Sequence, residues 1–78
     1  AKLRPMNARK DYYQILGVLP SAEDVVIRAA FRALAQRYHP DRFQGDPEEA
    51  TARMQEIIEA HTTLCDPARR QAYDQARS

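Results

Sequence analysis

Three consecutive residues, His39, Pro40 and Asp41, bring together the side chains best suited to chemistry in this sequence. The imidazole of His39 donates or accepts a hydrogen bond near neutral pH, Pro40 fixes one backbone dihedral angle, and Asp41 supplies a carboxylate. Together they predict a preorganised polar tip at a helix exit. The other reading is local: Pro40 stops a helix, Asp41 makes a turn bond and His39 caps the last carbonyls.

Two arginines align with this tripeptide if the preceding segment is helical. On a helical wheel that starts at Ile27, Arg28 falls at about 100° and Arg32 at about 140°. Extrapolation of the same helix places His39 at about 120°, on the same flank, whereas Arg37 falls at about 280°. This sorting of basic residues favours an acidic partner surface, although a charged face exposed only to solvent is the commoner meaning of such a pattern.

The histidines and the cysteine do not suggest a metal centre or an enzyme. His39 and His61 have no metal-type spacing to each other or to Cys65, and none of them forms a nucleophile–base pair by pattern. A single cysteine excludes an internal disulfide framework and indicates the cytoplasm or another reducing compartment. We therefore expect a domain without enzymatic activity, metal or cofactor.

Composition and charge indicate one small globular domain. The chain has 78 residues, of which 44% are hydrophobic and 29% charged. A chain of this length buries only roughly 60% of the surface that its unfolded form exposes, so the core must be small. The net charge of +1 is too low to indicate nucleic-acid binding, and no stretch approaches the ~18 consecutive apolar residues of a membrane-spanning helix.

Helix-start and helix-stop signals divide the chain into segments. Ser21 is the expected N-cap of a long helix, which Pro40 ends because the residue before a proline avoids helical angles. Asp46 and Pro47 mark the start of a second long helix, as N-cap and first-turn proline. We expect a flexible basic lead-in over residues 1–10, one domain over residues 11–76 with helices at about 11–16, 22–38, 48–64 and 67–76, and a loop at 39–47.

Each long helix carries one apolar stripe at helical spacing. The two stripes consist of Ile27, Ala30, Phe31, Leu34 and Tyr38, and of Ala50, Met54, Ile57, His61 and Leu64, the second widened by Ile58. Two such helices joined by one loop pack most simply as an antiparallel hairpin. The predicted fold is therefore all-α, a helical hairpin braced by short N- and C-terminal helices.

From Asp11 to Asp74 the sequence resembles the J-domain of the DnaJ co-chaperone family. The segments that carry the resemblance are DYYQILGV, IRAAFRALAQRYHPDR and EIIEAHTTLCDPARRQAYD, which match the family in order and spacing. Such a composite is far more specific than any one segment. The resemblance implies a helical hairpin with His-Pro-Asp at its tip, the same fold that the apolar stripes predict.

The resemblance also implies a partner and a mechanism. The domain would dock on a DnaK-type heat-shock chaperone and accelerate its ATP hydrolysis, which closes the chaperone on a client polypeptide. Asp41 would engage an arginine of the chaperone. The partner-binding residues implied are Arg28, Phe31, Arg32, His39, Pro40, Asp41 and Arg42. Arg70, Tyr73 and Asp74 match a segment of the family's last helix, for which we expect mostly structural work.

Several positions depart from the family pattern. Ala29 and Ala33 stand where many members carry lysine or arginine, so the basic flank is thinner. Phe31 replaces a usual tyrosine, and His61 stands at another common tyrosine position, where we expect a packed, hydrogen-bonded histidine within the apolar stripe rather than a ligand. Phe43 lies where polar residues are usual. Two roles stay open for Phe43: packing across the hairpin tip, or anchoring the partner.

Two other functions compete with the co-chaperone reading. A helix-turn-helix nucleic-acid-binding domain is also small and helical, but its turn has three or four residues, far fewer than the loop at 39–47. The second is a J-like hairpin that binds a partner without stimulating its ATPase. The intact His-Pro-Asp sequence speaks against that reading, and the thinned basic flank speaks weakly for it.

Overall fold

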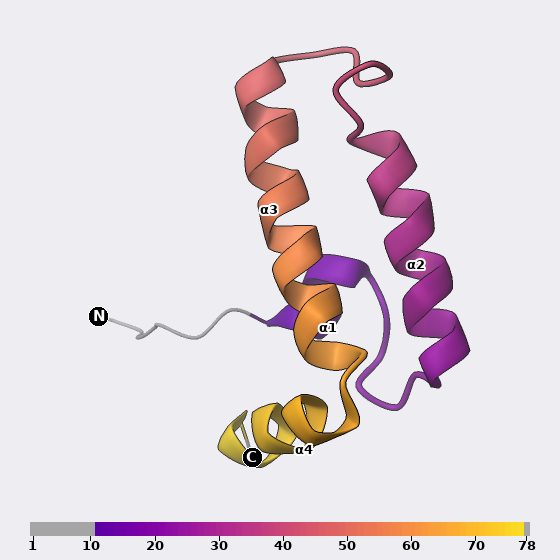
Figure 1. Cartoon of the computed structure of the whole chain (residues 1–78), viewed down its shortest axis with the longest axis vertical. Coiled ribbons are helices and arrows are strands. Elements are labelled where there is room, and N and C mark those ends of the chain that lie inside the picture. The colour runs from indigo at the N-terminus through magenta and orange to yellow at the C-terminus, as the bar shows by residue number, and fades with distance from the viewer. Residues whose placement is uncertain (1–10, 78) are drawn as a thin grey trace.

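The computed structural model describes residues 11–77, which within that range form four helices and no strand. The helices are α1 (Tyr12–Leu16), α2 (Asp24–Arg37), α3 (Pro47–Leu64) and α4 (Pro67–Arg77). The long helices α2 and α3 run antiparallel and side by side, α1 packs against both, and α4 contacts α3 at the end far from the hairpin loop (Figure 1). The predicted all-α hairpin with short flanking helices is confirmed. The expected lead-in at residues 1–10 lies outside the described residues.

The ends of α1 follow local sequence signals. The Asp11 carboxylate accepts a hydrogen bond from the Gln14 amide at 3.2 Å, which satisfies one of the free N–H groups of the first turn. Gly17 ends the helix in the left-handed conformation, with φ at 72°, and donates its amide proton to the Gln14 carbonyl. Glycine adopts this conformation without the steric cost that a Cβ brings.

The start of α2 differs from the expectation. Ser21 is not the N-cap; that position belongs to Glu23, whose side chain makes no capping hydrogen bond, and the helix begins at Asp24. The reason is a turn that precedes the helix, in which the Ala22 amide donates to the Leu19 carbonyl at 2.9 Å. Because residues 19–22 form this turn, the α-helix starts at Asp24, two residues later than the sequence predicts.

α3 and α4 both begin with proline directly after an aspartate whose carboxylate accepts a hydrogen bond from the first turn. The Asp46 carboxylate accepts from the Glu48 amide at 3.0 Å, and Pro47 is the first helical residue. The Asp66 carboxylate accepts from the Ala68 amide at 3.0 Å, before a helix that also begins with proline. A proline costs nothing at a first helical position, because its missing N–H has no partner within the helix. The predicted Asp46–Pro47 helix start is thus confirmed, and α4 begins at a second aspartate–proline pair.

The core gathers at one end of the hairpin, where α1 and α4 cover it. Its buried members are Tyr13, Leu16, Ile27, Ile57, Ala60, Leu64 and Tyr73. The other members of the α2 stripe are only half-buried and pack against this cluster. Ile58, expected to widen the α3 stripe, is 48% exposed, whereas Ala60 is fully buried. Ala50, near the loop end of α3, is also buried but does not belong to this cluster.

Arg70 of α4 connects α4 to α1 and to the turn before α2. Its Nε donates to the Tyr13 hydroxyl at 3.0 Å, and one terminal nitrogen donates to the Pro20 and Ala22 carbonyls at 3.0 and 2.8 Å. The Tyr13 hydroxyl in turn donates to Asp74 at 2.6 Å. The planar guanidinium supplies several donors in a fixed fork, which suits such a junction. Arg70 thereby fixes the turn that sets the start of α2.

Candidate partner-binding surface

His39, Pro40 and Asp41 lie in the loop that joins α2 to α3, and we call them the His-Pro-Asp turn. The Asp41 amide donates to Nδ1 of His39 at 3.1 Å, and the Asp41 carboxylate lies 3.9 Å from the same nitrogen. An Nδ1 that accepts a hydrogen bond leaves the proton of the neutral imidazole on Nε2. The turn therefore fixes one tautomer of His39 through its own backbone.

The polar groups of the turn are presented to solvent. The side chain of Asp41 is 89% exposed and that of His39 is 55% exposed. A pocket of about 420 Å³ lies beside them, lined by Ala35, Gln36, His39, Asp41 and Arg42. This surface offers a carboxylate, an imidazole and a guanidinium within one small area, which suits a partner with matching charged groups.

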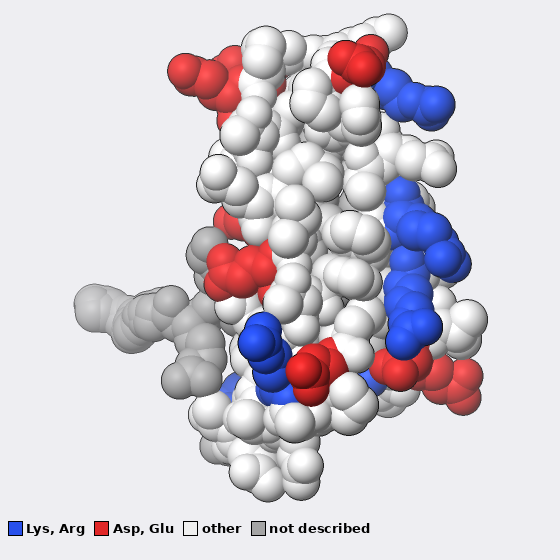
Figure 2. All heavy atoms as spheres, in the orientation of Figure 1, with Lys and Arg blue, Asp and Glu red and all other residues white. Residues whose placement is uncertain are grey.

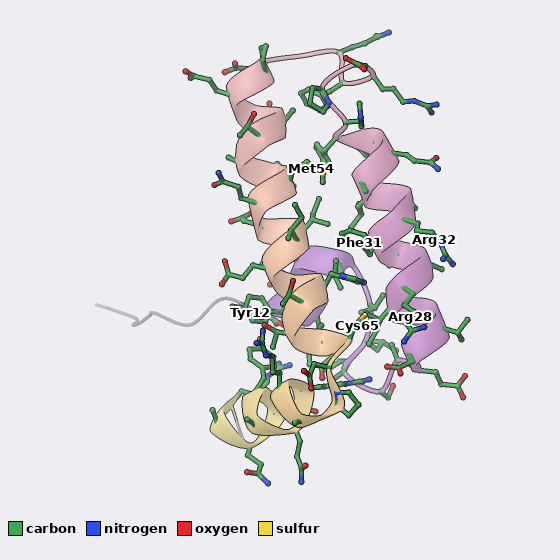
Figure 3. All side chains as sticks on the ribbon, viewed as in Figure 1. Tyr12, Arg28, Phe31, Arg32, Met54 and Cys65 are labelled. Atoms are coloured by element: carbon green, nitrogen blue, oxygen red, sulfur yellow. The ribbon has the colours of Figure 1, made fainter. Side chains whose placement is uncertain are left out.

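Arg28 and Arg32 are exposed on α2, and we call them the basic face. Figure 2 shows arginine side chains in a stripe along α2, and Figure 3 shows that both labelled arginines project from this helix. Their spacing of four residues places them on neighbouring turns of one side. The helical extrapolation that aligned His39 with them does not apply, because α2 ends at Arg37 and the turn sets the direction of His39.

Phe31, expected among the partner-binding residues, faces α3. It is half-buried, lies between the two long helices in Figure 3, and stacks on His61 with ring centroids 3.9 Å apart. The expectation that His61 packs within the apolar stripe is confirmed. Burial lowers the pKa of His61, and the positive charge of Arg28 lowers it further, since both disfavour the protonated imidazole. His61 is therefore held neutral next to the basic face.

Phe43 packs across the hairpin tip, one of the two roles that the sequence left open. Its ring centroid lies 5.3 Å from that of Tyr38, the residue that ends α2. The guanidinium of Arg53, from α3, lies 5.6 Å from the Tyr38 ring centroid on a cation–π contact. Sequence reasoning did not single out Arg53, because nothing local in α3 signals a partner on another helix.

Within residues 11–77, no three His, Cys, Asp or Glu side chains come together as a set that could hold a metal ion. None of the helices in that range has both the length and the apolar character needed to cross a membrane.

An all-helical hairpin with a polar turn at its tip and a basic face beside it has the form of a small protein-interaction domain. Comparison with known proteins shows the family to which this domain belongs. The family model of the DnaJ domain matches residues 11–74. The chain is also similar to the chaperone protein DnaJ of Deinococcus proteolyticus, with 54% identity over 68 residues. The chain therefore belongs to the DnaJ domain family.

The match includes most of this chain but only a small part of the Deinococcus protein. It covers 87% of this chain and 22% of that protein. The family match, residues 11–74, runs from the N-cap of α1 into α4 and so includes the helical hairpin and residues of both flanking helices.

Proposed function

We propose that this domain is a co-chaperone module that binds a DnaK-type heat-shock chaperone and stimulates its ATP hydrolysis. Membership of the DnaJ domain family supports a partner of this class. The single observation that carries the proposal is the His-Pro-Asp turn, in which a carboxylate that is 89% exposed sits on a backbone fixed by a hydrogen bond to His39. The compartment we propose is the cytoplasm, or another reducing compartment that holds such a chaperone.

Asp41 is the proposed anchor of the contact. An exposed carboxylate accepts two parallel hydrogen bonds from an arginine, and such charge-assisted pairs are stronger and more directional than neutral ones. Pro40 fixes one dihedral angle next to Asp41, which lowers the entropy lost on binding. His39 contributes an Nε2 proton, and Arg42 adds a positive charge at the rim of the same pocket.

The basic face supplies attraction over a longer range. Arg28 and Arg32 are both exposed, so they attract an acidic surface before the turn makes contact. Charges of this kind mainly raise the association rate and set orientation, and added salt screens them. We propose that the basic face orients the domain and that the His-Pro-Asp turn makes the decisive contact. Phe31, half-buried on the same helix, is proposed as a further contact residue.

The domain itself performs no bond-making chemistry in this scheme. Faster hydrolysis in the partner requires that the domain bind the hydrolysis-competent state of the chaperone more tightly than its other states. The chemical groups that cleave ATP belong to the chaperone, and no cofactor or metal of this domain takes part. The proposed result is closure of the chaperone on its client polypeptide.

A second candidate is a DnaJ-type domain that binds its partner without stimulating hydrolysis. Ala29 and Ala33, both exposed on α2, leave only Arg28 and Arg32 on the basic face, which favours weaker docking. Nucleic-acid binding has no comparable support, since the net charge is only +1.

Single-turnover ATP hydrolysis by a purified bacterial DnaK-type chaperone separates the two candidates. The rate is measured as the 78-residue chain is added over a range of concentrations. We expect the rate to rise and then saturate. Binding measured by titration, together with an unchanged rate at saturation, would favour the second candidate.

A further inference from the structure

Four residues form a small cluster beside the His-Pro-Asp turn. We call Tyr38, Phe43, Gly45 and Arg53 the tip cluster; the first three belong to the end of α2 and the loop, and Arg53 belongs to α3. The rings of Tyr38 and Phe43 lie 5.3 Å apart and are inclined by 32°. Both rings are half-buried, and Tyr38 also packs against the main core.

Gly45 allows the Phe43 ring to lie against the backbone. A Cβ placed on Gly45 would be 2.8 Å from Cε2 of Phe43 and 3.2 Å from its Cζ. The first distance is shorter than real Cβ contacts, so any larger residue at position 45 must displace the ring. The glycine is needed here for close approach rather than for an unusual backbone angle. Phe43 is thus confined on two sides, by Tyr38 and by Gly45.

The contact between the two rings closes the chain over the His-Pro-Asp turn. Tyr38 directly precedes the turn, and Phe43 follows it after Arg42. Within this closed segment, the amides of Arg42 and Phe43 both donate to the His39 carbonyl at 2.9 Å. The ring contact and the hydrogen bonds restrain the segment at both ends, whereas Asp41 itself is 89% exposed and has little packing to hold it.

We propose that Phe43 is a positioning residue, whose ring holds the His-Pro-Asp turn in the geometry that the chaperone recognises. The inference rests on the proposed function, because it takes that turn as the contact. If the restraint is lost, only a fraction of molecules carries the turn in the competent geometry. The apparent affinity then falls by that fraction, while the bound complex remains the same. Phe43 acts through His39 and Asp41 and needs no contact of its own with the partner.

The test compares four variants in the single-turnover ATPase titration with a bacterial DnaK-type chaperone. Phe43→Ala removes the ring, Gly45→Ala displaces it, Phe43→Tyr keeps it, and Ile58→Ala is the matched control, since it shortens an apolar side chain that is 48% exposed on α3. If the competent fraction falls to one tenth, Phe43→Ala requires about tenfold more domain for half-maximal stimulation, with an unchanged maximal rate. Gly45→Ala shifts the midpoint in the same direction, and the other two variants match the unsubstituted chain.

Nuclear Overhauser effects in the free domain test the same restraint without the chaperone. We expect cross-peaks between the ring protons of Phe43 and those of Tyr38, and between Phe43 and the α-protons of Gly45. Gly45→Ala should weaken the Phe43–Tyr38 cross-peaks and shift the Asp41 amide resonance, while far-ultraviolet circular dichroism stays unchanged. Absence of the Phe43–Tyr38 cross-peaks in the unsubstituted chain would overturn the positioning role.

The outcomes separate this inference from the proposed function. If the unsubstituted chain gives no stimulation, the proposed function fails, and the cross-peaks still decide whether the ring restrains the turn. If the chain stimulates hydrolysis and Phe43→Ala has the same midpoint, the proposed function stands and the positioning role fails. A lower maximal rate with an unchanged midpoint also contradicts positioning, because it assigns Phe43 to the bound contact.

Discussion

Phe31 of α2 and His61 of α3 stack face to face across the hairpin, with ring centroids 3.9 Å apart and planes inclined by 21°. The resemblance to the DnaJ family implies tyrosine at both positions, so the contact joins the two departures in one structural feature. Because Arg28 also lowers the pKa of His61, this feature links the packing of the hairpin to the charge of the basic face.

The His61 environment predicts a pH dependence of stability. Burial, and then the charge of Arg28, lower the pKa of His61 in the folded domain, so the unfolded chain binds a proton more readily. Stability from the neutral imidazole is therefore complete above the unfolded pKa of about 6.5 and declines as the pH falls below it. His61→Phe should reduce the loss of unfolding free energy between pH 7 and pH 5, measured by urea denaturation at both values. An identical loss in both proteins would contradict this role.

Charge reversal on the basic face should weaken docking. Arg28→Glu with Arg32→Glu places two like charges before an acidic partner surface, which slows association. We expect a reduction of roughly tenfold in the association rate at low ionic strength, and a smaller effect at high salt. Stopped-flow binding to a bacterial DnaK-type chaperone measures this rate.

A single charge reversal on α4 is the matched control for a single charge reversal on the basic face. Arg32→Glu and Arg69→Glu make the same change in net charge, and both arginines are exposed. Only Arg32→Glu should slow association. Equal slowing by both variants would mean that net charge, and not the basic face, attracts the partner.

Added positive charge next to the basic face should tighten binding to the chaperone. Ala29→Lys with Ala33→Arg introduces two positive side chains at exposed positions of α2, where the resemblance to the DnaJ family implies basic residues. We expect tighter binding to the chaperone at low salt, with unchanged maximal stimulation, since exposed charges chiefly affect encounter. Isothermal titration at two ionic strengths provides the comparison. Unchanged affinity at both would show that this part of α2 lies outside the contact.

Arg70 should matter for stability more than its neighbour does. Arg70→Met leaves the Tyr13 hydroxyl and the Ala22 carbonyl without the donors that they have in the folded domain. An unsatisfied, partly buried polar group costs about 1–3 kcal/mol, so we expect a loss of unfolding free energy in that range. Arg69→Met, at an exposed site, should cost about 0.5 kcal/mol or less. Equal losses in urea denaturation would show that the Arg70 junction does not stabilise the domain.

The helix starts that depend on neighbouring residues were predictable from the sequence. Asp11 and the aspartate–proline pairs at 46–47 and 66–67 act within one turn of their own helix, so a local pattern contains all the information. The start of α2 was not predictable in this way. The turn that displaces it is fixed by Arg70, 48 residues away in sequence from the Ala22 carbonyl that it binds.

The candidate site was likewise predictable from the sequence only where its features are local. The identities of His39, Pro40 and Asp41 are visible in the sequence, because the tripeptide and its position before a loop are local features. Their geometry is not, since it depends on a tautomer set by a backbone hydrogen bond and on a ring contact between Tyr38 and Phe43. The alignment of His39 with Arg28 and Arg32 assumed a helix that continues to residue 39, whereas α2 ends at Arg37, before Pro40.

Asp41→Asn is the substitution that tests the co-chaperone role most directly. The amide of residue 41 still donates to His39, so the turn keeps its backbone bond, while the charge that would bind an arginine is removed. Single-turnover ATP hydrolysis by a bacterial DnaK-type chaperone should be accelerated by the unsubstituted chain and unaffected by Asp41→Asn, with equal helicity in the two proteins. Equal acceleration by both would contradict the role assigned to the His-Pro-Asp turn.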